Sequence, residues 1–168
     1  MTTTEQMAVE AQTRQVLTFV LGAQTYGVDI LRVQEIRGWS AVTKIPQAPA
    51  HVLGVLNLRG SIVPIVDLRR RFNLERAEYT PITVIIVLSV LTGSSRRDFG
   101  VVVDGVSDVV DVTDADMRPA PELGSRGATS YISGLVTLQE RMVVLLDIDR
   151  LIGADLDGLG AEPNGVAA

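Results

Sequence analysis

The acidic and histidine side chains of this sequence do not form a pattern typical of catalysis. His51 is the single histidine and has no acidic neighbour, so a histidine in a turn or on the surface is favoured. Asp67 and Asp147 could form an acid–base pair, but each ends a predicted strand just before a helical turn. N-capping of that turn explains both aspartates without catalysis. Five aspartates between residues 104 and 116 lack the spacing and closing Glu of a calcium-binding loop. We therefore expect turn and rim carboxylates.

Two features that could bind an anion are also incomplete. Gly100 and Gly105 have the glycine spacing of a phosphate-binding loop, but the Lys that such a loop requires is absent. The basic run 69–71 beside Phe72 fits the solvated face of one helical turn better than an anion site. These patterns favour a binding module without catalytic activity, cofactor or metal.

The stretch 53–72 must position any binding site in the first half of the chain. Its sequence, LGVLNLRGSIVPIVDLRRRF, predicts a strand, a turn at Gly60-Ser61, a buried strand and a short helical turn. Arg59 lies at the tip of this apolar hairpin, where a cation is either solvated or paired. Glu35 is the best candidate partner, and loss of one member of a partly buried pair would strand the other charge.

Residues near Glu35 could contact a partner as well. The segment 31–38 favours a strand, although a helix would place Val33 and Ile36 on one face. Ile30, Val33 and Ile36 form either an apolar ridge or ordinary core. Trp39 is either an interface anchor or a half-buried packing residue.

The chain contains two copies of one pattern. Residues 54–72 match residues 134–152 at an offset of eighty, and residues 26–46 match residues 99–119 at an offset of seventy-three. Apolar matches arise easily in a chain that is 46% hydrophobic, but glycines, prolines and strand-ending aspartates coincide as well. The coinciding pairs are Gly27 with Gly100, Pro46 with Pro119, Gly54 with Gly134, and Asp67 with Asp147. We interpret this as a duplicated β unit.

Composition limits the class of protein. The 168 residues contain no apolar run of the roughly 20 residues that span a bilayer, no cysteine, and no signal-peptide pattern at the N-terminus, so we expect a cytosolic protein. A net charge of -5 argues against nucleic-acid binding. A half of roughly 60–70 residues has too small a core to be stable alone, so the halves should pack across an apolar seam, a natural place for a groove.

The expected elements are mainly strands with Gly at the bends. Strands are predicted at 15–21, 26–30, 31–38, 53–58, 62–66, 82–91, 99–103 and 106–112 and in a second hairpin within 131–152, with 92–98 as a flexible loop. Residues 1–14 and 154–168 are expected to be disordered tails. About ten short strands suggest two closed barrels, about 15–80 and 81–153, with strand exchange between them left open.

Five segments of the chain resemble the CheW family of chemotaxis adaptors. They are YGVDILRVQEIRG (26–38), GVLNLRGSIVPIVDLRRRF (54–72), FGVVVDGVSDVVDV (99–112), RPAPE (118–122) and YISGL (131–135). The resemblance implies a mainly β fold of two SH3-like five-stranded barrels packed together, with short helical turns. It also implies a non-catalytic adaptor in the cytoplasm, associated with membrane receptor arrays, that couples transmembrane chemoreceptors to the regulatory domain of the histidine kinase CheA.

The resemblance also assigns contact residues. The groove for the receptor tip, a helical hairpin, would include Val33, Glu35, Gly54, Arg59, Val84, Gly100, Val106 and Gly134. Kinase contacts would lie at Ile30 and Ile36, and at Glu122 and Leu123 in a second, ring-forming contact. Many relatives carry an aromatic at the position of Leu123, which implies a weaker contact. The alternatives are an adaptor for twitching or gliding motility and a small ligand-binding or enzymatic β-barrel.

Overall fold

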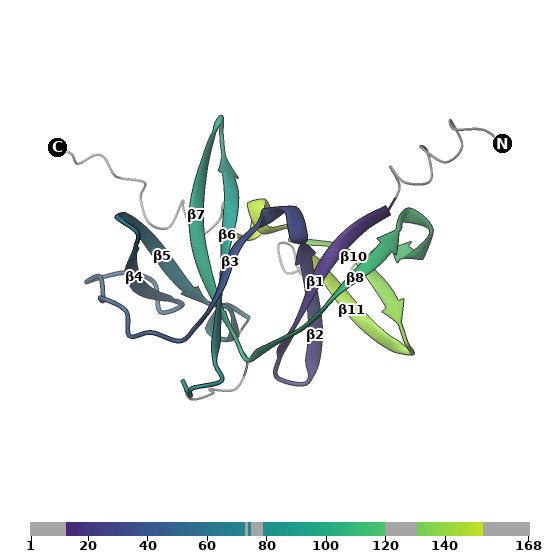
Figure 1. Ribbon diagram of the computed structural model, residues 1–168, viewed down its shortest axis with the longest axis horizontal. Helices are drawn as coiled ribbons and strands as arrows, with labels where there is room; N and C mark the ends of the chain where they lie inside the picture. Colours follow the sequence, from purple (N-terminus) through teal and green to yellow (C-terminus); the bar gives the residue numbers. More distant parts are fainter. Residues whose placement is uncertain (1–12, 73, 75–78, 120–130, 153–168) are drawn as a thin grey trace.

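The computed structural model describes residues 13–72, 74, 79–119 and 131–152, which form two β-sheets side by side (Figure 1). The first sheet, barrel A, has the strand order β8-β1-β2-β11-β10-β9, and the second, barrel B, has the order β3-β6-β7-β5-β4. Barrel A consists of β1 (Thr13–Leu21), β2 (Gln24–Asp29), β8 (Gly105–Thr113), β9 (Met117–Arg118), β10 (Ile132–Leu138) and β11 (Arg141–Leu146). Barrel B consists of β3 (Val33–Gly38), β4 (Val52–Leu58), β5 (Ser61–Asp67), β6 (Val84–Thr92) and β7 (Ser95–Val103). The helical pieces are short: η1 (Ile30–Arg32), α2 (Leu68–Arg71), η2 (Asp114–Asp116) and a turn over 148–152.

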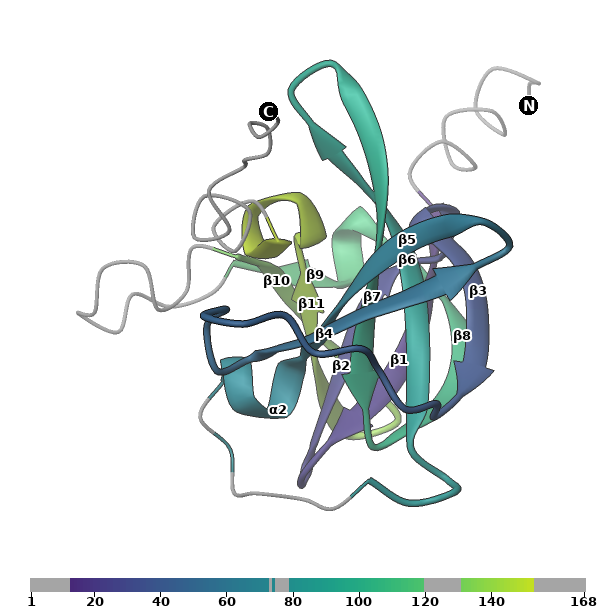
Figure 2. The same cartoon turned by 90° about the vertical axis from the view of Figure 1, so that its left-hand side faces the viewer.

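The continuation of an outer strand closes each sheet. In barrel A, the chain leaves β8 through η2 and returns as β9, which pairs with β10 at the far edge. In barrel B, the segment after β3 places Thr43 against Val55 of β4 in an isolated antiparallel bridge. Figure 2 looks onto barrel B, with the β4–β5 hairpin in front. Closure hides the edges of apolar strands that would otherwise pair with other chains.

The duplicated pattern is present in the structure, with strands exchanged between its copies. The order β8-β1-β2-β11-β10 in barrel A corresponds to β3-β6-β7-β5-β4 in barrel B, as the two sequence offsets require. The chain crosses to barrel B after β2 and returns to barrel A after β7. A boundary near residue 80 therefore does not separate the barrels, because each barrel contains strands from both halves of the chain.

The core has three parts, and the largest joins the barrels. Barrel A encloses one cluster of buried side chains: Val16, Val112, Val136, Val143 and Leu145. Barrel B encloses another: Leu58, Val63, Ile65, Ile85, Val87 and Val102. The shared core takes residues from both barrels, including Leu17, Phe19, Val66, Leu88, Phe99 and Leu151. The predicted apolar seam is confirmed, since neither small barrel buries its apolar surface alone.

Several local predictions need correction. The β4–β5 turn is centred on Arg59 and Gly60, whose φ angles are 54° and 90°, instead of Gly60-Ser61. Two positive φ angles in succession give the twist that a two-residue hairpin requires. Residues 30–32 form η1, so the strand predicted from residue 31 begins at 33. The predicted loop 92–98 is largely the end of a β6–β7 hairpin, and residues 13–14 belong to β1. Residues 1–12 and 153–168 lie outside the described residues.

Candidate functional site

Arg59 is paired and not only solvated, and its partner is Glu35, the best candidate from the sequence. Arg59 Nη2 donates a hydrogen bond of 2.6 Å to Glu35 Oε1. The Arg59 side chain is 79% exposed and the Glu35 side chain 23% exposed, so the carboxylate alone is partly buried. Arg37 also binds this carboxylate, with Nη1 at 3.4 Å from Oε2. Glu35 therefore holds the hairpin tip of β4–β5 against β3, while most of the Arg59 guanidinium faces solvent.

Exposure alternates along β3, as expected for a strand and not for a helix. Val33, Glu35 and Arg37 are half-buried, whereas Ile36 is 45% exposed. Ile30 and Val33 pack against the shared core. Ile30, Val33 and Ile36 therefore do not form one exposed apolar ridge: Ile36 is exposed, whereas Ile30 and Val33 are half-buried and pack against the shared core.

Three valines predicted for the receptor groove lie beside the shared core. Val33, Val84 and Val106 are half-buried and pack against it. Val33 opens β3, Val84 opens β6 and Val106 is the second residue of β8. Strands from both copies thus supply the apolar border of the seam, and Val33 lies two residues from Glu35.

The predicted glycines shape the barrels and are buried. Gly54 has φ +150°, and a Cβ there would lie 2.1 Å from the carbonyl oxygen of Thr43, where barrel B closes. Gly134 makes the corresponding approach to Arg118 in barrel A. A Cβ on Gly100 would lie 2.6 Å from Cδ1 of Ile65, inside barrel B. Because all three glycines are buried, they act on the shape of the barrels and offer no surface of their own.

Trp39 is a packing residue and not a free anchor. Its ring stacks on Tyr79 with centroids 4.3 Å apart, and both rings pack against the core of barrel B. The Tyr79 hydroxyl donates a hydrogen bond to Asp67. Burial and this hydrogen bond raise the pKa of Tyr79. The second kinase contact, Glu122 and Leu123, lies outside the described residues.

Two capping aspartates have the structural role that the sequence predicts. Asp67 Oδ1 accepts from the backbone of Arg69 at 3.0 Å, and Asp147 Oδ1 accepts from the backbone of Arg150 at 3.2 Å. Asp67 also binds the buried guanidinium of Arg69, whose Nη1 reaches Asp104 Oδ1 at 2.9 Å. The triple-arginine segment is therefore not a uniformly solvated face, because Arg69 is 3% exposed.

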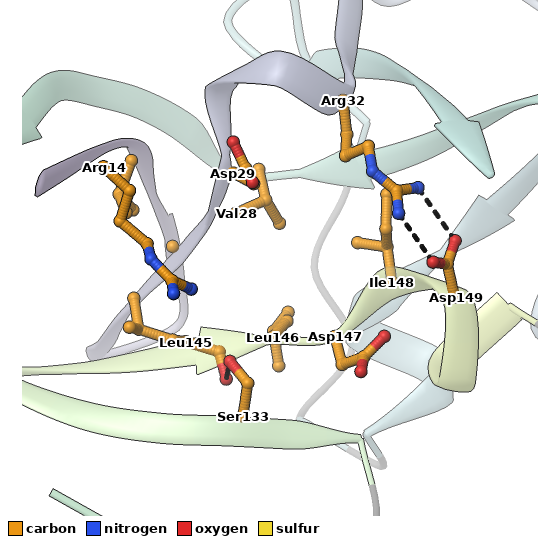
Figure 3. Close-up of a pocket in the computed structure, with 12 residues that line it drawn as sticks. Arg14, Val28, Asp29, Arg32, Ser133, Leu145, Leu146, Asp147, Ile148 and Asp149 are labelled. Carbon is orange, nitrogen blue, oxygen red and sulfur yellow. Dashed lines mark hydrogen bonds and ion pairs between the residues drawn. The ribbon is translucent and has the colours of Figure 1, made fainter. Parts of the chain in front are cut away.

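A pocket of about 210 Å³ opens on barrel A (Figure 3). Val28, Leu146 and Ile148 supply apolar side chains, and the Arg32–Asp149 ion pair stands at one end. This volume is below that of ordinary small-molecule sites. Both carboxylate oxygens of Asp149 bind Arg32, at 2.9 and 2.7 Å, and this partner holds the pKa of Asp149 below its ordinary value.

The sequence analysis missed this second ion pair. One signal for it exists: eighty residues separate Arg69 from Asp149, so equivalent positions of the repeat carry opposite charges. Among the described residues, no group of three His, Cys, Asp or Glu side chains could hold a metal ion. No helix in the described part of the chain is long and apolar enough to cross a membrane.

Comparison with known proteins gives consistent matches. Residues 15–155 match the family model for the CheW-like domain. The chemotaxis protein CheW of Klebsiella aerogenes is 46% identical over 153 residues, which cover 91% of this chain and 90% of the relative. That of Rhizobium meliloti is 40% identical over 142 residues, covering 84% and 89%. The crystal structure of the scaffolding protein TtCheW from Thermoanaerobacter tengcongensis is similar with a TM-score of 0.74 at 28% identity, covering 82% of this chain and 91% of that one.

Proposed function

This chain belongs to the CheW family of non-catalytic chemotaxis adaptors, and on this premise we propose that it couples transmembrane chemoreceptors to a histidine kinase of the CheA type. The observation that carries the proposal is the Glu35–Arg59 pair beside the apolar seam. It combines a partly buried carboxylate and an exposed guanidinium with the half-buried Val33, two residues from Glu35 on β3. Such a surface suits recognition of another protein.

The receptor face would lie where β3, the β4–β5 hairpin tip and the seam meet. A receptor tip made of two helices would lay an apolar stripe along Val33, Val84 and Val106. Arg59 has five N–H donors, of which the Glu35 bond uses one. The remaining donors can meet carboxylates or carbonyls of the receptor, and Glu35 limits the directions in which the guanidinium points.

The kinase face would lie on barrel B, where Ile36 is exposed. Ile62 in β5 is 62% exposed and adds an apolar contact that the sequence analysis did not single out. Ile30 would contribute less, because it packs against the shared core. The proposed ring-forming contact at Glu122 and Leu123 rests on the family resemblance alone. Binding to receptors would place the protein at the cytoplasmic side of receptor arrays.

Co-sedimentation tests this function directly. Receptor-containing membranes should bring down the purified chain, and should bring down CheA in larger amounts when the chain is present. Arg14→Ala serves as a control, because Arg14 forms an exposed ion pair in barrel A, 3.6 Å from Asp114. Absence of the chain from the membrane pellet, together with a ligand-dependent thermal shift of the isolated protein, would favour a ligand-binding β-barrel instead.

A further inference from the structure

The two connections that cross between the barrels are each held by an ion pair. The first connection is η1, between β2 of barrel A and β3 of barrel B. The second is Asp104, between β7 of barrel B and β8 of barrel A. Val33 follows the first connection directly, and Val106 follows the second after one residue. The placement of the seam valines therefore depends on how these connections are held.

The first connection is held by Arg32. Its guanidinium makes the bidentate pair with Asp149, in the helical turn that follows β11 of barrel A. Arg32 Nη1 also donates to the carbonyl oxygen of Ser89 in β6 of barrel B, at 3.0 Å. Asp149 Oδ1 in turn accepts from the backbone N–H of Leu91 in β6, at 2.8 Å. The Arg32–Asp149 pair thus ties the connection to both barrels.

The second connection is held by Arg69 of barrel B. Asp104 accepts from Arg69 through Oδ1, and through Oδ2 from the backbone N–H of Gly22, at 2.7 Å, in the β1–β2 turn of barrel A. Asp67 binds Arg69 as well, at 3.1 Å, and the Arg69 and Asp67 side chains are 4% and 2% exposed. The Arg69–Asp67 pair is thus buried, whereas the Asp104 side chain is 29% exposed, and Arg69 has two carboxylate partners.

The two ion pairs differ in polarity and in exposure. Arg69 and Asp149 occupy equivalent positions of the repeat and carry opposite charges. If the two connections exchanged partners, Arg32 would face Arg69 and Asp104 would face Asp149, and like charges would meet in both places. The Arg32 and Asp149 side chains are 22% and 28% exposed, and those of Arg69 and Asp104 are 4% and 29% exposed. Water and salt therefore reach both partners of the first pair but only the carboxylate of the second, whose guanidinium is enclosed and also bound by Asp67, so the first pair is weakened more.

We propose that Arg32 and Asp149 are positioning residues that set the angle at which β3 leaves barrel A, while Arg69 and Asp104 form the fixed pivot. Through this angle the Arg32–Asp149 pair places Val33 and the neighbouring Glu35 for receptor binding. The link to receptors rests on the proposed function, whereas the control of barrel orientation does not. Neither residue is required to touch the receptor.

Spin-label distances between the barrels test the orientation. The chain contains no cysteine, so Ser61→Cys in barrel B and Arg141→Cys in barrel A give a single labelled pair at equivalent, exposed positions of the repeat. Arg32→Ala should broaden or shift the distance distribution relative to the otherwise unchanged chain. Arg32→Lys keeps the charge but loses the bidentate geometry and should give an intermediate result. Arg14→Ala should leave the distribution unchanged.

Receptor binding by the same variants, without labels, tests the link to function. Arg32→Ala should weaken binding by about twofold to thirtyfold, the range expected for residues that act without contacting the ligand. An unchanged distance distribution in Arg32→Ala and Arg32→Lys would overturn control of barrel orientation, whatever the binding result. A changed distribution with unchanged receptor affinity would overturn the positioning role. Failure of the unmodified chain to bind receptors would refute the proposed function, while the distances would still test the orientation.

Discussion

Removal of either member of the Glu35–Arg59 pair should weaken receptor coupling, but the two substitutions should differ in their effect on stability. Arg59→Ala removes a side chain that is 79% exposed and leaves Glu35 bound to Arg37. Arginine and alanine both carry a Cβ, so the backbone strain at the positive φ of 54° is the same before and after the substitution. An exposed ion pair contributes about 0–1 kcal/mol to the free energy of unfolding.

Glu35→Ala should cost more stability. It removes the carboxylate that binds both Arg59 and Arg37, and Arg37 is already the residue whose buried Nε lacks a hydrogen-bond partner among the described residues. A half-buried guanidinium that loses its acceptor costs about 1–3 kcal/mol. The melting temperature should therefore fall by about 2–12 °C for Glu35→Ala and by about 4 °C or less for Arg59→Ala.

Receptor binding should separate the functional role of the pair from its effect on stability. If the pair binds as a unit, both variants should lose affinity by a similar factor despite their unequal stability. The double variant should then lose little more than either single variant, because contacting residues are not additive. Affinity for receptor-containing membranes, measured well below the melting temperature, gives the three values, with Arg14→Ala as the control.

The reasoning would be refuted if both single variants bound receptors and activated the kinase like the unmodified chain. It would also be refuted if affinity followed melting temperature, with Glu35→Ala impaired and Arg59→Ala normal. In that case Glu35 would serve the fold alone, and the exposed guanidinium of Arg59 would have no part in recognition.

Three further predictions concern the fold that carries the site. Gly54→Ala should destabilise the protein by more than about 3 kcal/mol, since its Cβ would meet the backbone of Thr43. Gly38→Ala should be close to neutral, since a Cβ there meets nothing within 4 Å. Urea unfolding compares the two variants, and equal midpoints would contradict the role of Gly54 in closing barrel B. Asp67→Asn should cost about 1–3 kcal/mol, since it removes one of the two carboxylates that bind a buried arginine. The equivalent, more exposed Asp147→Asn should cost about 1 kcal/mol or less, and similar losses would show that burial does not decide the cost. Because the folded-state pKa of Asp149 is depressed, its contribution to stability should be complete above the ordinary Asp pKa of about 3.9 and lost as the pH falls through the depressed value. The difference in melting temperature between the unmodified chain and Asp149→Asn should therefore be constant from about pH 5 to 8 and shrink below about pH 4. A difference that widened in acid would contradict the depressed pKa.

The part of the site that could be predicted from the sequence depends on the chemistry of neighbouring residues. Arg59 stands between apolar runs at a turn, a place where a cation needs either water or a carboxylate, and Glu35 precedes it in a segment with strand character. The capping roles of Asp67 and Asp147 follow from their position between a strand and a helical turn. The predicted strand already places Val33 and Ile36 on opposite faces, because they are three residues apart. The turn at residues 30–32, which sets Ile30 against the shared core before β3 begins, was not predicted.

The sequence by itself determined the repeated β unit, the hairpins and the matched glycines, since these depend on alternation and turn chemistry within short stretches. It gave Glu35 as the best candidate partner of Arg59, and the tertiary structure decided that the two side chains meet. Only the tertiary structure decided which strands share a barrel and which charges hold the crossings between barrels. The alternation of apolar residues fixes the two faces of a strand but not its neighbour in the sheet. Arg32 and Asp149 lie 117 residues apart and meet only because the β1–β2 and β6–β7 pairs exchange barrels between the two copies, so their contact follows from the complete fold.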